Sequence, residues 1–252
     1  ETIFVHTFPS VFADVMLPQN FHSRPCLKSI PYEEYYLRTI FNDKFHLPMH
    51  INMDVNQKIR NHQSWPKLVE MVKQLSYLKG KDDEFTLASG RKSSHFFDMK
   101  PLMMDPKGSI LLAELIEIYL NELEPDFVGG LELGAVPLTA IVITGNASSK
   151  KGSKRKGFMV RKEPKGRGGR KTSNPPGIEG SSLANGGKIV VLEDVTTTGG
   201  SAINAVNMIK SNTNCEILGV LTILDREEGG EQAFNNAGIP FEALLKLSDI
   251  AG

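Results

Sequence analysis

The chain has 252 residues, of which 40% are hydrophobic and 23% are charged, as is typical of one ordinary globular domain plus an extension. Its two cysteines, Cys26 and Cys215, lie far apart, which argues against a disulfide framework and a cysteine-based metal site and favours a cytoplasmic protein. The formal net charge is zero, yet residues 150–171 contain eleven Lys and Arg against one acid, a net charge of +10. This basic segment predicts a polyanionic ligand.

The first 63 residues mix aromatic residues, prolines and five of the six histidines without a helical or strand period, and we expect residues 1–63 to be an extension of unknown role. A helix is predicted to start at Ser64 as its N-cap, with Pro66 in its first turn. Its apolar residues share one face, and Gly80 is expected to end it. We place the domain boundary near Gln63, with the main domain over 64–252.

The pattern over 85–100 predicts two strands joined by a Ser-Gly-Arg-Lys turn. A helix follows, whose apolar stripe lies within 110–119; this run contains two glutamates and is too short to cross a bilayer, so no membrane association is expected. A strand from Phe127 leads into a glycine-rich turn and a buried helix over 138–143. Further strands are predicted at 157–160, 216–224 and 241–247. The alternation of strands and helices predicts an α/β fold with a mainly parallel sheet.

The most informative stretch is 188–209. Its apolar run Ile189–Leu192 predicts a buried parallel strand, and apolar pairs at helical spacing follow from Ala202. The threonines and glycines between them predict a phosphate site at a helix N-terminus. Glu193 and Asp194 would repel a bare phosphate but would hydrogen-bond the hydroxyls of a ribose. A sugar phosphate therefore fits the motif, which is neither a Walker loop nor a dinucleotide fingerprint.

This stretch resembles the phosphoribosyl pyrophosphate (PRPP) signature of the type I phosphoribosyltransferases. Residues 85–98, 161–168 and 224–226 match, in the right order, further motifs of the orotate phosphoribosyltransferase family, and the resemblance covers roughly 65–250. It implies a mainly parallel central sheet flanked by helices, with a small hood built from N- and C-terminal elements. It also implies transfer of the phosphoribosyl group from PRPP to orotate, which gives orotidine 5-monophosphate and diphosphate in de novo pyrimidine biosynthesis.

The resemblance also implies roles for individual residues. The catalytic residues would be Lys162, Lys165 and Asp194. Phe96, Phe97, Thr197 and Arg226 would bind orotate, the arginine by pairing with the carboxylate. Mg²⁺ is the expected cofactor, held mainly by PRPP, and no direct protein ligand is predicted. PRPP would contact Arg161, Lys162, Lys165, Arg167, Glu193, Asp194, Val195, Thr196, Thr197, Thr198, Gly199, Gly200 and Ser201.

The chain departs from the family pattern at three positions. Ala88 and Gly134 stand where members carry a lysine, and Arg167 replaces the usual loop histidine. An arginine stays charged and can act only as an electrostatic clamp, so we expect activity to be reduced at most. These departures give some support to an alternative, a regulator of the same fold that binds RNA through its basic segment. A transferase that uses another nucleobase is a second alternative, which an unclear base preference would favour.

The residues from Arg161 to Gly180 are rich in glycine and proline, and we expect them to form a lid that closes over bound substrate. In the family this basic loop reaches across a homodimer to the neighbouring site, so the resemblance implies a homodimer with loop exchange. A nucleic-acid partner is not expected, because aromatic residues that could stack on bases are nearly absent from the basic segment, which holds only Phe158.

Overall fold

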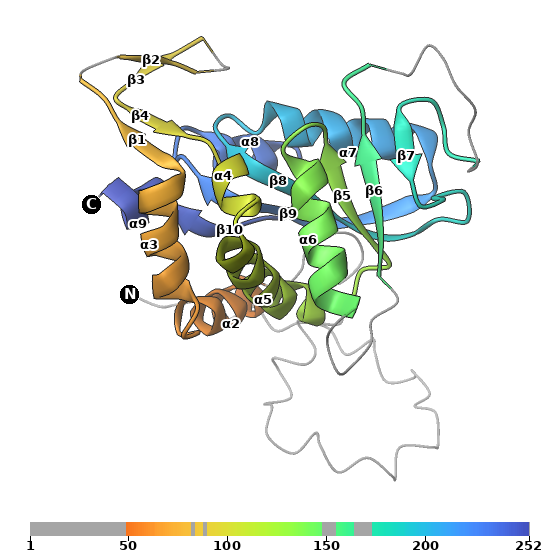
Figure 1. Ribbon diagram of the computed structural model, residues 1–252. Coiled ribbons are helices and arrows are strands. Elements are labelled where there is room, and N and C mark those ends of the chain that lie inside the picture. Colours follow the sequence, from red (N-terminus) through yellow and green to blue (C-terminus); the bar gives the residue numbers. More distant parts are fainter. Residues whose placement is uncertain (1–48, 82–83, 88–89, 148–154, 164–172, 252) are drawn as a thin grey trace, which may run out of the picture. The chain divides into compact units, whose positions relative to one another are not determined.

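The computed structural model describes residues 49–81, 84–87, 90–147, 155–163 and 173–251, all within one compact unit over 46–252 (Figure 1). A six-stranded sheet forms its centre, and every strand pair is parallel except that of β7 with β6, which confirms the predicted α/β class. In spatial order the strands are β10 (Phe241–Lys246), β9 (Cys215–Asp225), β8 (Gly187–Thr196), β5 (Phe127–Leu131), β6 (Lys156–Val160) and β7 (Ile178–Gly180).

Helices cover both faces of this sheet (Figure 1). One set of helices, α2 to α6, shares a core with Val190 and Leu192 of β8. On the other side of the sheet, α7 packs against Ile189 and Val191. All four side chains are fully buried, which is why this parallel strand has a continuous apolar run rather than an alternating one. The first set is α2 (Met49–Arg60), α3 (Trp65–Leu75), α4 (Lys100–Met103), α5 (Pro106–Leu123) and α6 (Ala135–Ala147); the second is α7 (Gly200–Asn212) and α8 (Gly230–Asn236).

The start of the main domain differs in detail from the prediction. Helix α3 begins after Ser64, but the Ser64 hydroxyl donates to Glu114 Oε2 at 2.6 Å and does not cap the helix. The helix ends at Leu75 rather than at Gly80, because Tyr77–Lys79 forms strand β1, antiparallel to β4 (His95–Phe97). Leu78 is therefore a strand residue, and it is 56% exposed rather than part of the buried helix face.

Helix α2 lies upstream of the boundary predicted at residue 63. Its residue Ile59 is only 1% exposed and belongs to the main core. At its end, Arg60 donates two hydrogen bonds to the Asp249 carboxylate, at 2.9 and 3.0 Å. The compact unit thus includes residues that the sequence assigned to the extension; residues 1–48 lie outside the described part of the chain, and their role stays a prediction.

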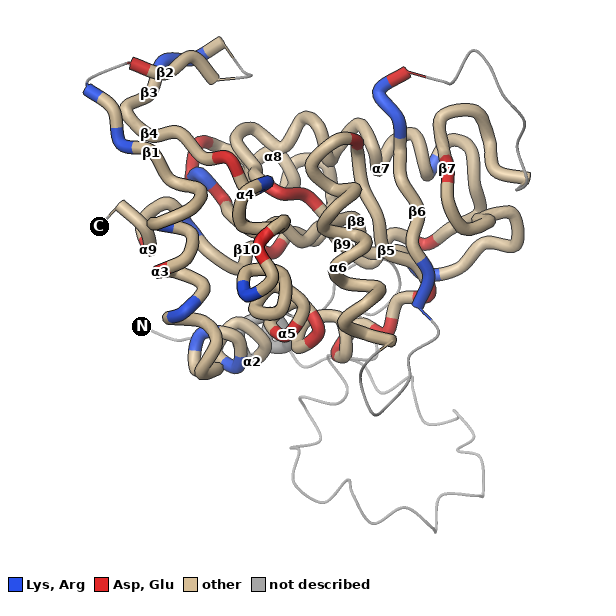
Figure 2. Tube along the Cα trace, viewed as in Figure 1, with Lys and Arg blue, Asp and Glu red and all other residues tan. Residues whose placement is uncertain are grey.

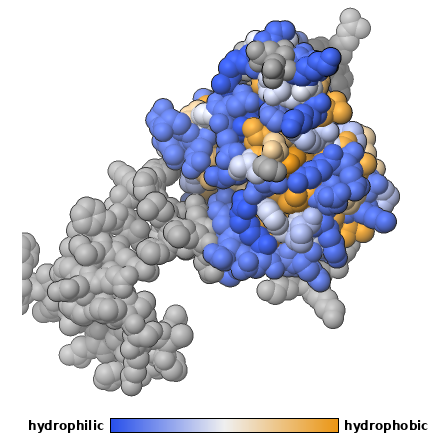
Figure 3. All heavy atoms as spheres, turned by 90° about the vertical axis from the view of Figure 1, so that its left-hand side faces the viewer, coloured by the Kyte–Doolittle hydropathy of each residue, from blue (hydrophilic) through white to orange (hydrophobic). Residues whose placement is uncertain are grey.

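The N-terminal part of the predicted hood is formed by short strands that lie before α4 in the chain. Strands β2 (Phe85–Thr86) and β3 (Lys92–Ser93) form the expected hairpin, and the β1–β4 pair lies beside it (Figure 1). The C-terminal helix α9 (Leu247–Ala251) contacts α3. Figure 3 looks onto this side of the molecule and shows apolar side chains at the centre of a largely hydrophilic face.

The strand order creates a switch point between β5 and β8. From β5 the chain passes through α6 to β6 on one side, whereas from β8 it passes through α7 to β9 on the other. Loops that leave the carboxyl ends of these two central strands therefore diverge, and such a crevice is where open α/β sheets bind ligands.

Candidate active site

The PRPP motif lies at the carboxyl end of β8, at the switch point. The strand continues through Thr196, so Glu193 and Asp194 are strand residues. The loop between β8 and α7 is therefore shorter than predicted. Gly199 has φ +77°, a left-handed conformation that favours glycine, and α7 begins directly after it. Because the first turn of a helix leaves backbone N–H groups without intrahelical partners, this exposed turn can bind a phosphate.

Glu193 and Asp194 are acids in an environment that disfavours their charged forms. Burial, followed by the neighbouring Asp194 charge, raises the pKa of Glu193 to about 8, against a smaller opposing effect of Lys162. The Glu193 Oε2 atom is buried and has no hydrogen-bond partner among the described residues. Burial also raises the pKa of Asp194, opposed by backbone N–H groups and by Lys100. The carboxyl groups of this pair can therefore form hydrogen bonds with hydroxyl groups of a ligand.

The turn after β5 forms the opposite wall of this crevice. A Cβ atom placed on Gly134 would overlap the Asp194 carboxylate, so this turn and the acid are in close contact. A lysine at this position, as in some members of the family, would require Asp194 to move. The Glu132 carboxylate in the same turn accepts a hydrogen bond from the backbone N–H of Lys162 at 2.9 Å.

The base of the basic loop is held next to this wall. Arg161 lies between the carboxylates of Glu132 and Glu179, at 3.6 and 3.7 Å, and its backbone N–H donates to Gly177 O at 2.8 Å. Glu179 belongs to β7, so the far end of the predicted lid is a strand paired with β6 rather than loop. Figure 2 shows the basic residues at this end of β6 and the acidic residues along β8. Lys165 and Arg167 lie outside the described residues, as does Ala88.

Arg226 follows β9 and is joined directly to the PRPP motif. Its backbone N–H donates to Thr196 O at 2.9 Å, and its side chain is buried. The guanidinium donates to Ser93 Oγ at 3.1 Å and to His95 O at 3.0 Å, both in the hood. Its Nε atom donates to Glu228 Oε1 at 2.8 Å. The structure therefore brings the predicted orotate arginine to the predicted sugar-phosphate loop.

The two predicted aromatic residues pack in different directions, because neighbouring strand residues alternate sides. The ring of Phe97 lies 5.7 Å from the Arg226 guanidinium carbon and stacks on Tyr77 at a centroid distance of 5.0 Å. The ring of Phe96 contacts Phe85 of β2 instead, at 5.5 Å. Phe97 thus joins the Arg226 cluster, whereas Phe96 packs within the hairpin region of the hood.

Two charged residues of this region, Lys100 and Glu228, were not predicted as site residues from the sequence. Lys100 forms an ion pair with Asp98 at 2.5 Å and also acts electrostatically on Asp194. Its place, three residues after the Phe96–Phe97 pair, was the available signal. Glu228, which pairs with Arg226, follows it by two residues, a spacing that has no meaning until the turn after β9 is known.

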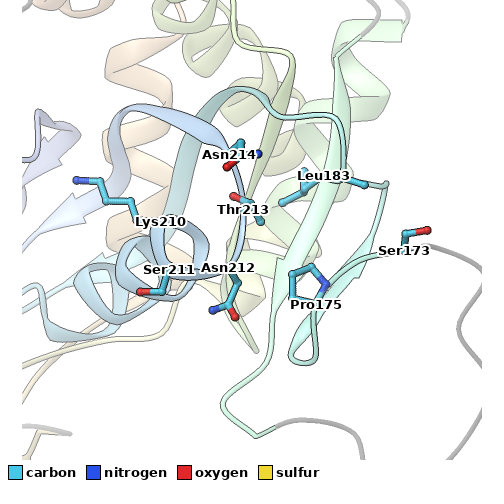
Figure 4. A pocket seen from close by; sticks show the side chains of 9 residues that line it. Ser173, Pro175, Leu183, Lys210, Ser211, Asn212, Thr213 and Asn214 are labelled. Atoms are coloured by element: carbon cyan, nitrogen blue, oxygen red, sulfur yellow. The ribbon is translucent and has the colours of Figure 1, made fainter.

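The described residues contain no group of three or more His, Cys, Asp or Glu side chains that could hold a metal ion, and none of their helices is long and apolar enough to cross a membrane. A cavity of about 490 Å³ lies at the C-terminal end of α7, lined by Lys210–Asn214 and by Ser173, Pro175 and Leu183 (Figure 4). It contains none of the predicted site residues.

Comparison with known proteins decides the family. No protein-family model matches the chain. A curated orotate phosphoribosyltransferase from Rhodopseudomonas palustris (strain TIE-1) is 47% identical over 183 residues, which cover 73% of this chain and 94% of that protein. The chain belongs to the orotate phosphoribosyltransferase family. Another member, from Aquifex aeolicus (strain VF5), is 38% identical over 185 residues, 73% of this chain and 96% of that protein.

A solved structure of this family supports the same assignment. The orotate phosphoribosyltransferase of Mycobacterium tuberculosis H37Rv in complex with PRPP matches with a TM-score of 0.59 and 28% identity, over 75% of this chain and 99% of that one. The predicted type I phosphoribosyltransferase fold and the resemblance to orotate phosphoribosyltransferases are thereby confirmed.

Proposed function

We propose that this chain transfers the phosphoribosyl group of PRPP to orotate, giving orotidine 5-monophosphate and diphosphate in pyrimidine biosynthesis. The observation that carries the proposal is the 2.9 Å hydrogen bond from Arg226 N to Thr196 O. It supports the proposal because it holds Arg226, which we propose binds the orotate carboxylate, next to the loop that we propose binds the ribose 5-phosphate. Family membership supports the same reaction.

In this proposal the β8–α7 segment binds the ribose 5-phosphate moiety. The backbone N–H groups from Val195 to Ser201 surround the 5-phosphate at the start of α7, where the helix dipole favours an anion. Glu193 and Asp194 accept hydrogen bonds from the ribose hydroxyls. Asp194 also stabilises the positive charge that develops on the ribose as its anomeric C–O bond breaks.

The leaving diphosphate is neutralised by the basic loop. Arg161 and Lys162 stand at the loop's base, and Lys165 and Arg167, outside the described residues, would complete it. Mg²⁺ supplies further charge neutralisation on the diphosphate when bound. Two partly buried acids with raised pKa values are a poor cage for a cation on their own, so the donor set suits an ion whose ligands come mainly from PRPP.

Orotate is oriented from the β9 and hood side. The Arg226 guanidinium pairs with the carboxylate of orotate, and Phe97 provides an apolar contact near that pair. Thr197, the residue after Thr196, also contacts orotate. In this proposal Phe96 is a second aromatic contact of orotate, more distant than Phe97. Positioning and electrostatic stabilisation of the transition state then carry the reaction, and no covalent enzyme intermediate is required.

The test is the loss of orotate ultraviolet absorbance when protein, PRPP and Mg²⁺ are mixed. We expect Mg²⁺-dependent loss that Lys165→Ala and Arg226→Ala both suppress, while Lys67→Ala, a change of an exposed lysine on α3, behaves as wild type. PRPP binding without consumption of orotate would contradict the proposal. In that case, release of diphosphate with another base would favour a different transferase, and RNA binding without diphosphate release would favour the regulator.

We further propose a homodimer in which the basic loop enters the neighbouring site. Met104, Ile110 and Leu133 are large apolar residues with exposed fractions of 72, 58 and 67%, on contacting segments around α4, α5 and α6, and they mark a candidate interface. Lys165→Ala and Asp194→Asn subunits, each inactive alone, should regain about a quarter of wild-type activity after random exchange between twofold dimers. Recovery of no activity, with exchange verified, would place both residues in one subunit's site.

A cytoplasmic location is also part of the proposal. Its support is the chain's low cysteine content and the free thiol of Cys215, which suit a reducing compartment. Cell fractionation with an antibody to the protein tests it, and recovery of the protein in a secreted or membrane fraction would contradict it.

A further inference from the structure

The guanidinium of Arg226 is already paired with a carboxylate of its own chain. Only 3% of the Arg226 side chain is exposed, and its Nε donates to Glu228 Oε1 at 2.8 Å. The other carboxylate oxygen, Glu228 Oε2, lies 2.7 Å from a guanidinium nitrogen of Arg91, which also donates to Glu228 O at 3.0 Å. Glu228 therefore lies between two arginines, one buried beneath the hood and one half-exposed at the end of the β2–β3 turn.

The hydrogen bonds of Arg226 determine what a substrate carboxylate must displace. A substrate carboxylate that takes the place of Glu228 pairs with Nε, as the Glu228 carboxylate does. Nε is taken by Glu228, and Nη2 is taken by Ser93 and by the His95 carbonyl. Among these partners only Glu228 is an anion. Exchanging it for another carboxylate keeps the buried guanidinium neutralised, whereas breaking a contact without replacement leaves a buried charge uncompensated.

We propose that, before orotate binds, Glu228 pairs with the part of Arg226 that binds the orotate carboxylate. When orotate binds, its carboxylate replaces Glu228 on Arg226, and Glu228 remains bound to Arg91. This inference rests on the proposed function. Glu228 acts through Arg226 and is a positioning and selectivity residue rather than a catalytic one. A neutral pyrimidine such as uracil cannot replace it, so the exchange favours bases that carry a carboxylate.

Removing the negative charge of Glu228 tests the exchange. Glu228→Gln weakens the resident partner and removes its repulsion of the incoming anion, so KM for orotate is expected to fall about tenfold, which corresponds to roughly 1.4 kcal/mol. KM for PRPP stays unchanged, which shows that the variant is folded. Glu228→Asp, which keeps the charge, returns KM for orotate toward the wild-type value. Glu231→Gln, which removes an exposed acid in α8, is the matched control and leaves both KM values unchanged.

For Arg91→Gln we expect the opposite change in KM for orotate. Without its second arginine, Glu228 stays on Arg226, and KM for orotate rises. In the double variant Arg91→Gln/Glu228→Gln this rise disappears, because Arg91 acts only through Glu228. A rise that persists in the double variant would show that Arg91 contacts substrate directly and would overturn the proposed relay.

The outcomes separate this inference from the proposed function. If wild-type protein consumes no orotate, the proposed function fails. If the wild type is active but Glu228→Gln leaves KM for orotate unchanged or raises it, Glu228 is a structural partner of Arg226 only, and the inference alone is refuted. A general loss of activity in Glu228→Gln, with KM for PRPP also raised, would likewise count against it.

Discussion

Replacing Glu193 with glutamine is expected to stabilise the empty protein at pH 8 while weakening its affinity for PRPP. Burial and the Asp194 charge raise the pKa of Glu193 from 4.5 to about 8. A carboxyl whose pKa is higher in the folded than in the unfolded state contributes stability that is fully present below pH 4.5 and is lost as the pH rises through 8. Glutamine carries no such charge and escapes this loss.

The size of the effect follows from the pKa difference. At about 1.4 kcal/mol for each pKa unit, the ceiling at pH 8 is roughly 5 kcal/mol. Glu193 is only partly buried as a whole residue, so water screens the charge of its carboxylate in the folded protein. We therefore expect a smaller gain for Glu193→Gln, of about 1–2 kcal/mol in the free energy of unfolding at pH 8.

The assay is urea unfolding of wild type and Glu193→Gln at pH 5, 6.5 and 8. The two stability curves should lie close together at pH 5 and separate progressively toward pH 8, with Glu193→Gln the more stable. Glu216→Gln, a change of an exposed acid on β9, controls for net charge. A constant difference across this range, or a wild type that is the more stable at pH 8, would refute the reasoning from burial.

Other predictions test the walls of the site. Lys100→Met should raise KM for PRPP roughly fivefold, or ~1 kcal/mol, whereas Lys67→Met, a change of an exposed lysine on α3, should not; equal values in steady-state kinetics would remove Lys100 from the site. Gly134→Lys should displace Asp194 and lower kcat/KM at least about tenfold; an unchanged value would mean that the turn adapts. Gly199→Ala should lower the free energy of unfolding by about 1–2 kcal/mol, because its φ of +77° is left-handed; thermal unfolding checks this.

The central motif could be predicted from sequence because its signals are local. The apolar run Ile189–Leu192 marks a strand buried on both faces, and the following acids and glycines have few other uses in a strand-to-helix turn. Resemblance to a known family added Arg226, whose role depends on a distant hood. In these cases the residue type itself carries the chemistry.

The parts that were missed depend on long-range pairing. Leu78 continues the apolar spacing of α3, and only the pairing of β1 with β4 shows why the helix ends earlier. Helix α2 has a mixed sequence, and its contact from Arg60 to Asp249 spans most of the chain. Glu228 resembles any exposed acid in a turn until Arg226 and Arg91 are placed around it. Local periodicity contains no information about such partners.

Both halves of the site carry an electrostatic cost in the empty protein that substrates can relieve. Glu193 is held in surroundings that favour its protonated form, and in the proposed complex ribose hydroxyls would bond to its Oε2 atom, which has no hydrogen-bond partner among the described residues. Arg226 is neutralised by Glu228, which in our proposal is replaced by the carboxylate of orotate. Because Thr196 O and Arg226 N are hydrogen-bonded, the two proposed binding regions lie at the adjacent ends of β8 and β9. Binding energy can then be used to align two substrates rather than to order the protein around them.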